Sequence, residues 1–219
     1  MARLSSGKRI NSASDDAAGV AISSRLSAEI RGTDQAIRNS LDGQALIDTA
    51  EGAHKEIENI LQRMREVTIQ AANDTNNDQD RANLQAEIDA MTTEIDRIAG
   101  TTTWAGASLI ADDAAATVFS FQVGAATGTQ NQITVSIAGM TATGLSLGTS
   151  AAPDVDVETD AASANAGTAL IDAAIETVNI QRSELGAVSN RLNHTVNNLT
   201  NISSNLSAAK GGIEDADFA

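Results

Sequence analysis

Residues 47–71 read IDTAEGAHKEIENILQRMREVTIQA and carry mainly apolar or small side chains at alternating steps of three and four. Residues on that spacing lie along one side of an α-helix, and its repetition is typical of helices that pack along a seam. The stretch therefore predicts a long helix with one buried face. The positions of the repeat are Ile47, Ala50, His54, Ile57, Leu61, Met64, Thr68 and Ala71.

Two further stretches repeat this spacing. One runs over residues 185–209 near the C-terminal end, and a shorter one runs from Leu84 to Ile98. Each of these apolar helix faces must be buried against another helix. We therefore predict a mainly α fold: an elongated antiparallel helical bundle of two N-side helices and one long C-side helix. The predicted helix-bundle seam consists of Ile57, Leu61, Met64, Leu84, Ile88, Met91, Ile95, Leu185, Val188, Leu192, Leu199, Ile202 and Leu206.

Polar caps and glycines set the expected ends of the two N-side helices. The first helix is expected over about 15–72. The second should begin at Asp78 or Asp80 as its cap and end at Ala99, because Gly100 follows it. Glycine directly after a helical repeat is a common stop signal.

The C-side helix is expected from Thr159 or Asp160 to Lys210, where Gly211 and Gly212 should stop it. The order of elements predicts a single elongated, rod-like domain over residues 1–219 that is discontinuous in sequence. Its parts are 1–110 for the N-side helices and their connection, 111–160 for a β-hairpin and a variable middle segment, and 161–219 for the C-side helix.

The helical period disappears between about 101 and 161. Apolar residues there alternate with polar ones in two short runs, with the turn-rich stretch 124–131 between them. This pattern predicts a β-hairpin with one apolar face lying on the helices. The only proline, Pro153, is expected in a linker. The alternating residues are Phe119, Phe121, Val123, Ile133, Val135 and Ile137.

Composition argues against several classes of function. The 219 residues include no cysteine and only four aromatic side chains, too few to line a typical ligand pocket. A formal net charge of −15 with 14 lysines and arginines argues against nucleic acid and anionic membranes. No apolar run is long enough to predict a membrane span, and no cleaved signal peptide is recognised at the start.

The candidate chemical groups do not form a catalytic pattern. His54 begins HKEIE rather than a zinc-binding HExxH, and His194 lies far away in the sequence. The acidic pairs at 15–16 and 112–113 are expected on solvated surfaces. No phosphate-binding loop or nucleophile motif is found. We therefore expect no enzymatic activity, no metal and no cofactor.

Five stretches resemble bacterial flagellin, and together they cover more than half of the chain. They occur in the order expected for that family, which makes the resemblance specific. The stretches are RLSSGKRINSASDDAAGVAISSRL (3–26), LQRMREVTIQAAN (61–73), LQAEIDAMTTEIDRIAG (84–100), FQVGA (121–125) and ELGAVSNRLNHTVNNLTNISSNLSAAKGGIEDADFA (184–219).

The resemblance implies a structural subunit of the flagellar filament, which polymerises for swimming motility. Its implied partners are other flagellin subunits, export chaperones and the filament cap, and its implied location is extracellular, in the flagellum or at the cell surface. Flagellins usually carry further helical segments before RLSSG and after EDAD, and these are absent from this sequence. We therefore expect a rod-domain fragment, lacking the terminal filament-core helices, that folds without forming filaments.

The resemblance also implies an innate-receptor contact of the Toll-like class. The family motif matches Gln62, Arg63 and Glu66 on the first helix and Glu87 on the second. The alternative is that these are ordinary exposed charges making weak surface pairs. Val67 replaces a leucine common in the family, so a weaker receptor contact is one expectation.

Two other functions remain open. A hook–filament junction protein would share these helices, although the closeness of RLSSGKRIN and ELGAVSNRLN to flagellin speaks against it. A surface protein that binds polysaccharide or host glycan would need an exposed aromatic platform, and Trp104 is the candidate. Residues 104–106, Trp-Ala-Gly, stand where the family commonly has Phe-Asn-Gly, which predicts altered packing there.

Overall fold

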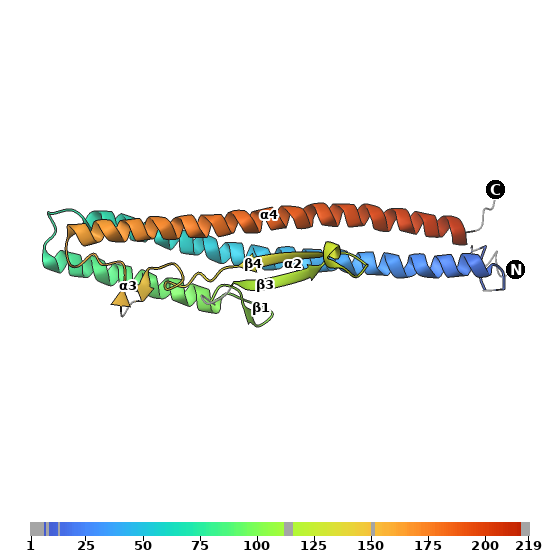
Figure 1. Ribbon diagram of the computed structural model, residues 1–219, viewed down its shortest axis with the longest axis horizontal. Helices are drawn as coiled ribbons and strands as arrows, with labels where there is room; N and C mark the ends of the chain where they lie inside the picture. Colours follow the sequence, from blue (N-terminus) through green and yellow to red (C-terminus); the bar gives the residue numbers. More distant parts are fainter. Residues whose placement is uncertain (1–6, 8, 13, 112–115, 150–151, 216–219) are drawn as a thin grey trace. The chain divides into compact units, whose positions relative to one another are not determined.

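The computed structural model describes residues 7, 9–12, 14–111, 116–149 and 152–215. The acidic pair singled out above, Asp112 and Asp113, lies outside these ranges. The described chain contains three α-helices, α2 (Ala17–Ala71), α3 (Asp78–Thr101) and α4 (Ala161–Glu214), together with short antiparallel strand pairs (Figure 1). The predicted fold class, mainly α with a small β-hairpin region, is confirmed.

The contacts divide the chain into two compact units. Unit 1 comprises Met1–Gln44, Ser120–Thr134 and Ser189–Ala219, and unit 2 comprises Ala45–Phe119 and Val135–Val188. Each unit thus combines part of α2 with part of α4. The helix α3 belongs to unit 2 alone.

Unit 2 contains the seam that residues 47–71 predict. All eight positions of that repeat are buried, including the polar side chains of His54 and Thr68. The facing part of α4 continues the same spacing from Ala164 to Leu185 and is also buried. This α4 stripe was not predicted, because its small residues give a weak apolar pattern. Its buried positions are Ala164, Gly167, Ile171, Ala174, Val178, Gln181 and Leu185.

The buried face of α3 is shifted by one position from the predicted stripe. Ile88 and Ile95 are buried as expected, but Leu84 and Met91 are only half-buried. Polar side chains occupy the core side instead, including Gln85. This arrangement is possible because the Gln85 amide donates to the Val155 carbonyl (3.2 Å) and accepts from the Val157 amide (2.8 Å). A glutamine with satisfied hydrogen bonds can replace leucine in a core.

The segment between the hairpin and α4 also belongs to the core of unit 2. Its five methionine, leucine and valine side chains are all buried at 0–4% exposure, whereas the sequence predicted only a variable middle segment. Pro153 lies in β6 (Ala152–Pro153), which pairs with β5 (Gly148–Thr149). The segment therefore covers the helices instead of serving as a linker. The five residues are Met140, Leu145, Leu147, Val155 and Val157.

The predicted hairpin is present as β3 (Thr117–Gln122) and β4 (Gln132–Ile137), joined by a loop that ends in η1 (Thr129–Asn131). Its buried apolar face is carried mainly by β4, where Ile133, Val135 and Ile137 are at most 6% exposed. Phe119 and Phe121 on β3 are only half-buried. Alternation along β4 therefore predicted its buried face correctly.

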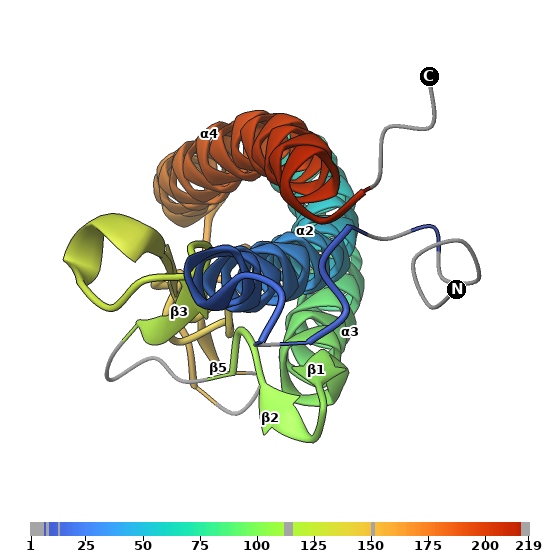
Figure 2. The same ribbon diagram turned by 90° about the vertical axis from the view of Figure 1, so that its right-hand side faces the viewer.

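A second, unpredicted hairpin follows α3 and pairs β1 (Thr103–Trp104) with β2 (Ala107–Ser108) (Figures 1 and 2). Its two turn residues, Ala105 and Gly106, have φ angles of +50° and +85°. Positive φ at both turn positions favours an Asn-Gly pair and costs alanine about 1–2 kcal/mol. Alanine at position 105 is thus less suited to this turn than asparagine would be.

The ends of α3 differ from the sequence prediction. Asn77, not Asp78 or Asp80, is the N-cap, and Asp80 completes a capping box with it: each side chain accepts the other residue's backbone N–H. Gly100 does not stop the helix. The end falls at Thr101, because the hydroxyl and backbone N–H of Thr102 bind the Ile98 carbonyl and so replace a glycine stop.

The C-terminal end of α4 also extends beyond its predicted stop. Gly211 and Gly212 lie inside the helix, which ends at Glu214. Two donors from the N-terminal segment satisfy the last carbonyls: the Arg9 guanidinium binds Ile213 O (3.0 Å), and the Arg9 backbone N–H binds Glu214 O (2.7 Å). At its other end, Asp160 caps α4 by accepting from Ser163 N–H (2.6 Å).

Unit 1 has a thinner apolar interior. Of the predicted seam residues here, Leu192 and Leu199 are buried, Leu206 is half-buried and Ile202 is 37% exposed. The seam therefore does not continue through Ile202. In this unit α2 and α4 are also joined by polar contacts, such as the Ser203 hydroxyl donating to Asp34 (2.8 Å). Val188, at the end of unit 2, is half-buried.

Candidate functional site: an exposed charged surface on α2 and α3

The structure brings the predicted receptor-contact residues together on unit 2. Arg63 of α2 donates through Nε (3.0 Å) and Nη2 (2.8 Å) to one carboxylate oxygen of Glu87 on α3. Its remaining terminal nitrogen, Nη1, donates to Glu66 one helical turn further along α2 (3.0 Å). One guanidinium therefore connects two carboxylates from two different helices.

This cluster faces solvent. The side chains of Arg63, Glu66 and Glu87 are 52%, 70% and 40% exposed. Hydrogen bonds to Glu87 and then Glu66 raise the pKa of Arg63, which keeps it charged at every physiological pH. Exposed ion pairs of this kind contribute little to folding stability, so their groups can exchange partners at low cost.

The neighbouring positions behave differently from one another. Gln62 is exposed, and its amide donates to Glu58 (3.3 Å) rather than to a member of the Arg63 cluster. Val67 is fully buried in the seam. A side chain at position 67 therefore cannot touch a partner directly, and the expected weakening of receptor contact by valine has no direct basis in this structure.

A second charged cluster lies between α2 and α4 within unit 2 and was missed by the sequence reasoning. Arg182 donates to Glu51 (2.8 Å) and also to Glu58. Hydrogen bonding to Glu51 is the main cause that raises the pKa of Arg182. The spacing of these residues along the chain gives no signal of the pairing.

His54 lies beside this cluster and is completely buried. Neither of its ring nitrogens has a well-formed hydrogen bond to the described residues. Burial lowers the pKa of His54 to about 4, although the nearby Glu51 carboxylate opposes the shift. The histidine is therefore a neutral core residue at pH 7. This placement is consistent with a seam histidine and offers no metal site, and the described residues contain no metal-binding group of three.

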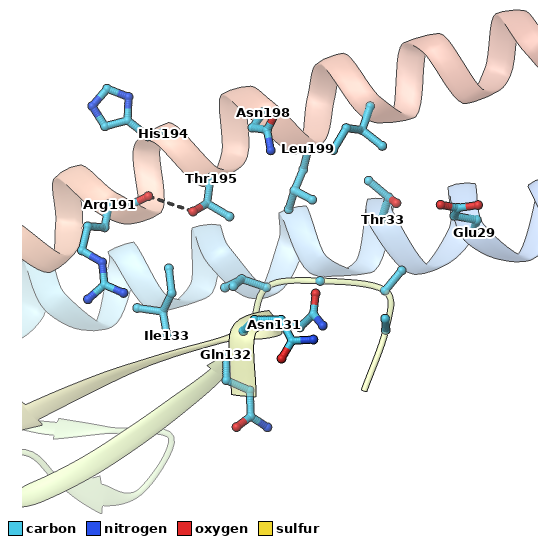
Figure 3. A pocket seen from close by; sticks show the side chains of 16 residues that line it. Glu29, Thr33, Asn131, Gln132, Ile133, Arg191, His194, Thr195, Asn198 and Leu199 are labelled. Carbon is cyan, nitrogen blue, oxygen red and sulfur yellow. Dashed lines mark hydrogen bonds between the residues drawn. The ribbon is translucent and has the colours of Figure 1, made fainter. Parts of the chain in front are cut away.

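The other candidates are positioned as follows. Trp104 is half-buried in β1, so part of its ring is unavailable to a sugar. His194 is exposed on α4 and lines a groove of unit 1 with residues of α2 and the hairpin loop (Figure 3).

Among the described helices, none is both long and apolar enough to cross a membrane.

Packed helices, a small hairpin and solvent-exposed ion pairs define a helical-bundle protein. Comparison with known proteins identifies its family. Residues 1–115 match the bacterial flagellin N-terminal helical region, and residues 168–219 match the bacterial flagellin C-terminal helical region. A flagellin from Halalkalibacterium halodurans is 47% identical over the whole chain, which spans 78% of that relative. The chain belongs to the bacterial flagellin family.

Solved structures agree with this assignment. The crystal structure of Bacillus cereus flagellin is 32% identical, with a TM-score of 0.61 over 79% of this chain and 94% of that one. A Vibrio parahaemolyticus structure assigned to a flagellar hook-associated protein has a TM-score of 0.75 over 92% of this chain and all of that one, at 19% identity. That likeness shows the fold alone. Sequence identity, not fold, therefore favours flagellin over a junction protein.

Membership of the family fixes the general role. The chain is a structural subunit of the flagellar filament, with motility as the general function, and the family is not enzymatic. Flagellins assemble with one another into filaments, and they are components of the extracellular flagellum.

Proposed function

We propose that the surface formed by Gln62, Arg63, Glu66 and Glu87 is a contact site for the innate flagellin receptor of the Toll-like class. The observation that carries this proposal is the position of Arg63, held between Glu87 and Glu66 on an exposed face of unit 2. Three of the four residues that the family motif implies, Arg63, Glu66 and Glu87, are also joined by hydrogen bonds, which supports the proposal.

The geometry suits recognition by a partner. A planar guanidinium presents several N–H donors in a fixed fork, which fits carbonyl and carboxylate groups. Glu87 anchors Arg63 through two hydrogen bonds, so less side-chain freedom is lost when a partner binds. Removal of water at the interface would strengthen these charged contacts.

The test is receptor activation in reporter cells by purified Arg63→Ala, Glu87→Ala and wild-type protein. We expect Arg63→Ala to raise the half-maximal concentration by at least about tenfold, the effect of an interface hot spot, and Glu87→Ala to have a smaller effect. Circular dichroism should show an unchanged fold, because the cluster is exposed.

The chain supplies a matched control. Arg97 pairs with Glu94 on α3 at 2.6 Å, and the two side chains are 59% and 44% exposed, close to the 52% and 40% of Arg63 and Glu87. Arg97→Ala should leave activation unchanged. Full activation by Arg63→Ala, or equal loss in Arg97→Ala, would contradict the proposed receptor contact.

Export chaperones and the filament cap stay proposed partners of the subunit, without residues assigned to them.

A further inference from the structure

The two units differ sharply in charge. Unit 1 contains eight acidic and eight basic side chains, so its formal charge is zero. Unit 2 contains 21 acidic and six basic side chains, so the whole net charge of −15 lies in unit 2. Two copies of unit 2 therefore repel each other, whereas unit 1 carries no net charge that would oppose an acidic partner.

Ion pairing follows the same division. The five arginines of unit 2 each lie in an ion pair with an acidic side chain. In unit 1, four arginines make no ion pair with any described residue. The neutral unit thus presents unpaired cations, while the acidic unit has a large excess of carboxylates. The four arginines are Arg25, Arg31, Arg38 and Arg191.

One of these cations lies at a groove. The groove has a volume of about 660 Å³ and is bounded by α2, the loop of the hairpin and α4, all within unit 1 (Figure 3). Arg191 extends from α4 on the side of the hairpin at one end, and Glu29 of α2 lies at the other end. The amides of Asn131 and Asn198 lie between them and can donate hydrogen bonds to a carboxylate.

We propose that the Arg191 end of this groove binds acidic side chains on unit 2 of a second copy of the chain. Charge complementarity selects this occupant, because a unit 2 surface provides carboxylates in excess and like-charged contacts between two units 2 are disfavoured. A contact between different surfaces of identical chains is heterologous, and such contacts build open assemblies when they do not close. The arrangement therefore matches the self-assembly of this family.

Cross-linking tests the proposal directly. Because the chain has no cysteine, Asn198→Cys places a single thiol in the groove, and a benzophenone attached there captures whatever lies beside it. An equimolar mixture of nitrogen-15-labelled and unlabelled protein distinguishes links between copies from links within one copy. We expect mass spectrometry to find links between copies that join position 198 to peptides of unit 2, residues 45–119 or 135–188.

Charge reversal supplies the matched comparison. Arg191→Glu should lower the yield of these links by about fivefold, and raising the salt from 0.05 to about 0.5 M should act in the same direction. Arg97→Glu changes the net charge equally but makes the acidic unit 2 more acidic, so it should not lower the yield. The proposal fails if the links go to unit 1, if both reversals act alike, or if no links form between copies at the highest soluble concentration.

Discussion

Unit 1 and unit 2 share two helices but are stabilised in different ways. Of the 32 hydrophobic residues buried in the described chain, 26 lie in unit 2 and six in unit 1. Along α2, the buried positions of unit 1 are small or polar, as at Ser23, Thr33 and Ser40, whereas those of unit 2 include Ile57 and Leu61. One continuous helix can therefore serve a dense core over one part and close, partly polar packing over another.

The largest expected effect tests this difference in packing. Leu61 in unit 2 is completely buried, and Leu199 in unit 1 is 8% exposed and lines the groove. Leu61→Ala should destabilise the protein by about 3 kcal/mol, because it leaves a dry cavity, and Leu199→Ala by about 1 kcal/mol, because water can enter. Urea unfolding followed by circular dichroism measures both free energies of unfolding.

Hydrogen exchange locates the same effect within the chain. Amides of α2 in unit 1, residues 17–44, should exchange faster than those of residues 45–71, because fewer buried apolar contacts hold them. If the two leucine substitutions cost the same free energy and protection is uniform along α2, the helix is one cooperative element. The two units would then not differ in the stability that packing gives them.

The next effect concerns the two histidines, one in each unit. Burial lowers the pKa of His54 from 6.5 to about 4, so between these values the unfolded chain binds more protons than the folded one. Above pH 6.5 His54 is neutral in both states and does not lower the free energy of unfolding. Below pH 6.5 its protonation in the unfolded chain lowers that free energy, by on the order of 3 kcal/mol at pH 4. His54→Leu should remove this part of the pH dependence, measured as urea unfolding at pH 7 and pH 4.5.

His194 gives the control, because it is exposed in unit 1. His194→Gln should keep the wild-type difference between the two pH values. His54→Leu should also stabilise the protein at pH 7, since it removes two buried nitrogens that lack well-formed hydrogen bonds. A wild-type pH dependence in His54→Leu would mean that carboxylates alone cause acid unfolding.

Local pattern predicted the helices and hairpin well, but it could not find contacts made by irregular backbone. The repeat from Ile47 to Ala71 has a strict period and is buried throughout. Leu147 and Val155 also reach the core, yet they lie in a segment without a period. Gln85 is buried because backbone groups 70 and 72 residues away satisfy its amide, and no local signal reveals such partners. The predicted end of α4 was wrong for a similar reason, since Arg9, which is distant in the sequence, binds a carbonyl in the last turn of α4.

The candidate site shows the same limit. Arg63 and Glu87 are 24 positions apart on different helices, so spacing alone cannot predict that they pair. The family resemblance selected them, and the fold then placed them together. The Arg182 cluster had no such motif and was missed, because its partners lie 124 and 131 residues away in the sequence. The division of charge between the units also becomes visible only once the units are known.

The smallest expected effect sharpens the comparison at two glycines of α2. A Cβ at Gly52 in unit 2 would meet no atom within 4 Å, so Gly52→Ala should stabilise the protein by about 1 kcal/mol through helix propensity. A Cβ at Gly32 in unit 1 would lie 2.8 Å from the Cβ of Ala125 in the hairpin loop. At Gly32 this close contact outweighs the gain in helix propensity. Gly32→Ala should therefore destabilise the protein by about 1 kcal/mol, because the loop must move away. Urea midpoints give both values, and limited proteolysis within residues 124–131 reports the loop. Equal stabilisation by the two alanines, with no increase in loop cleavage, would show that close approach of the loop to α2 contributes nothing to unit 1. Opposite signs would show that unit 1 requires glycine where the loop meets α2, whereas α2 in unit 2 tolerates a larger residue at position 52.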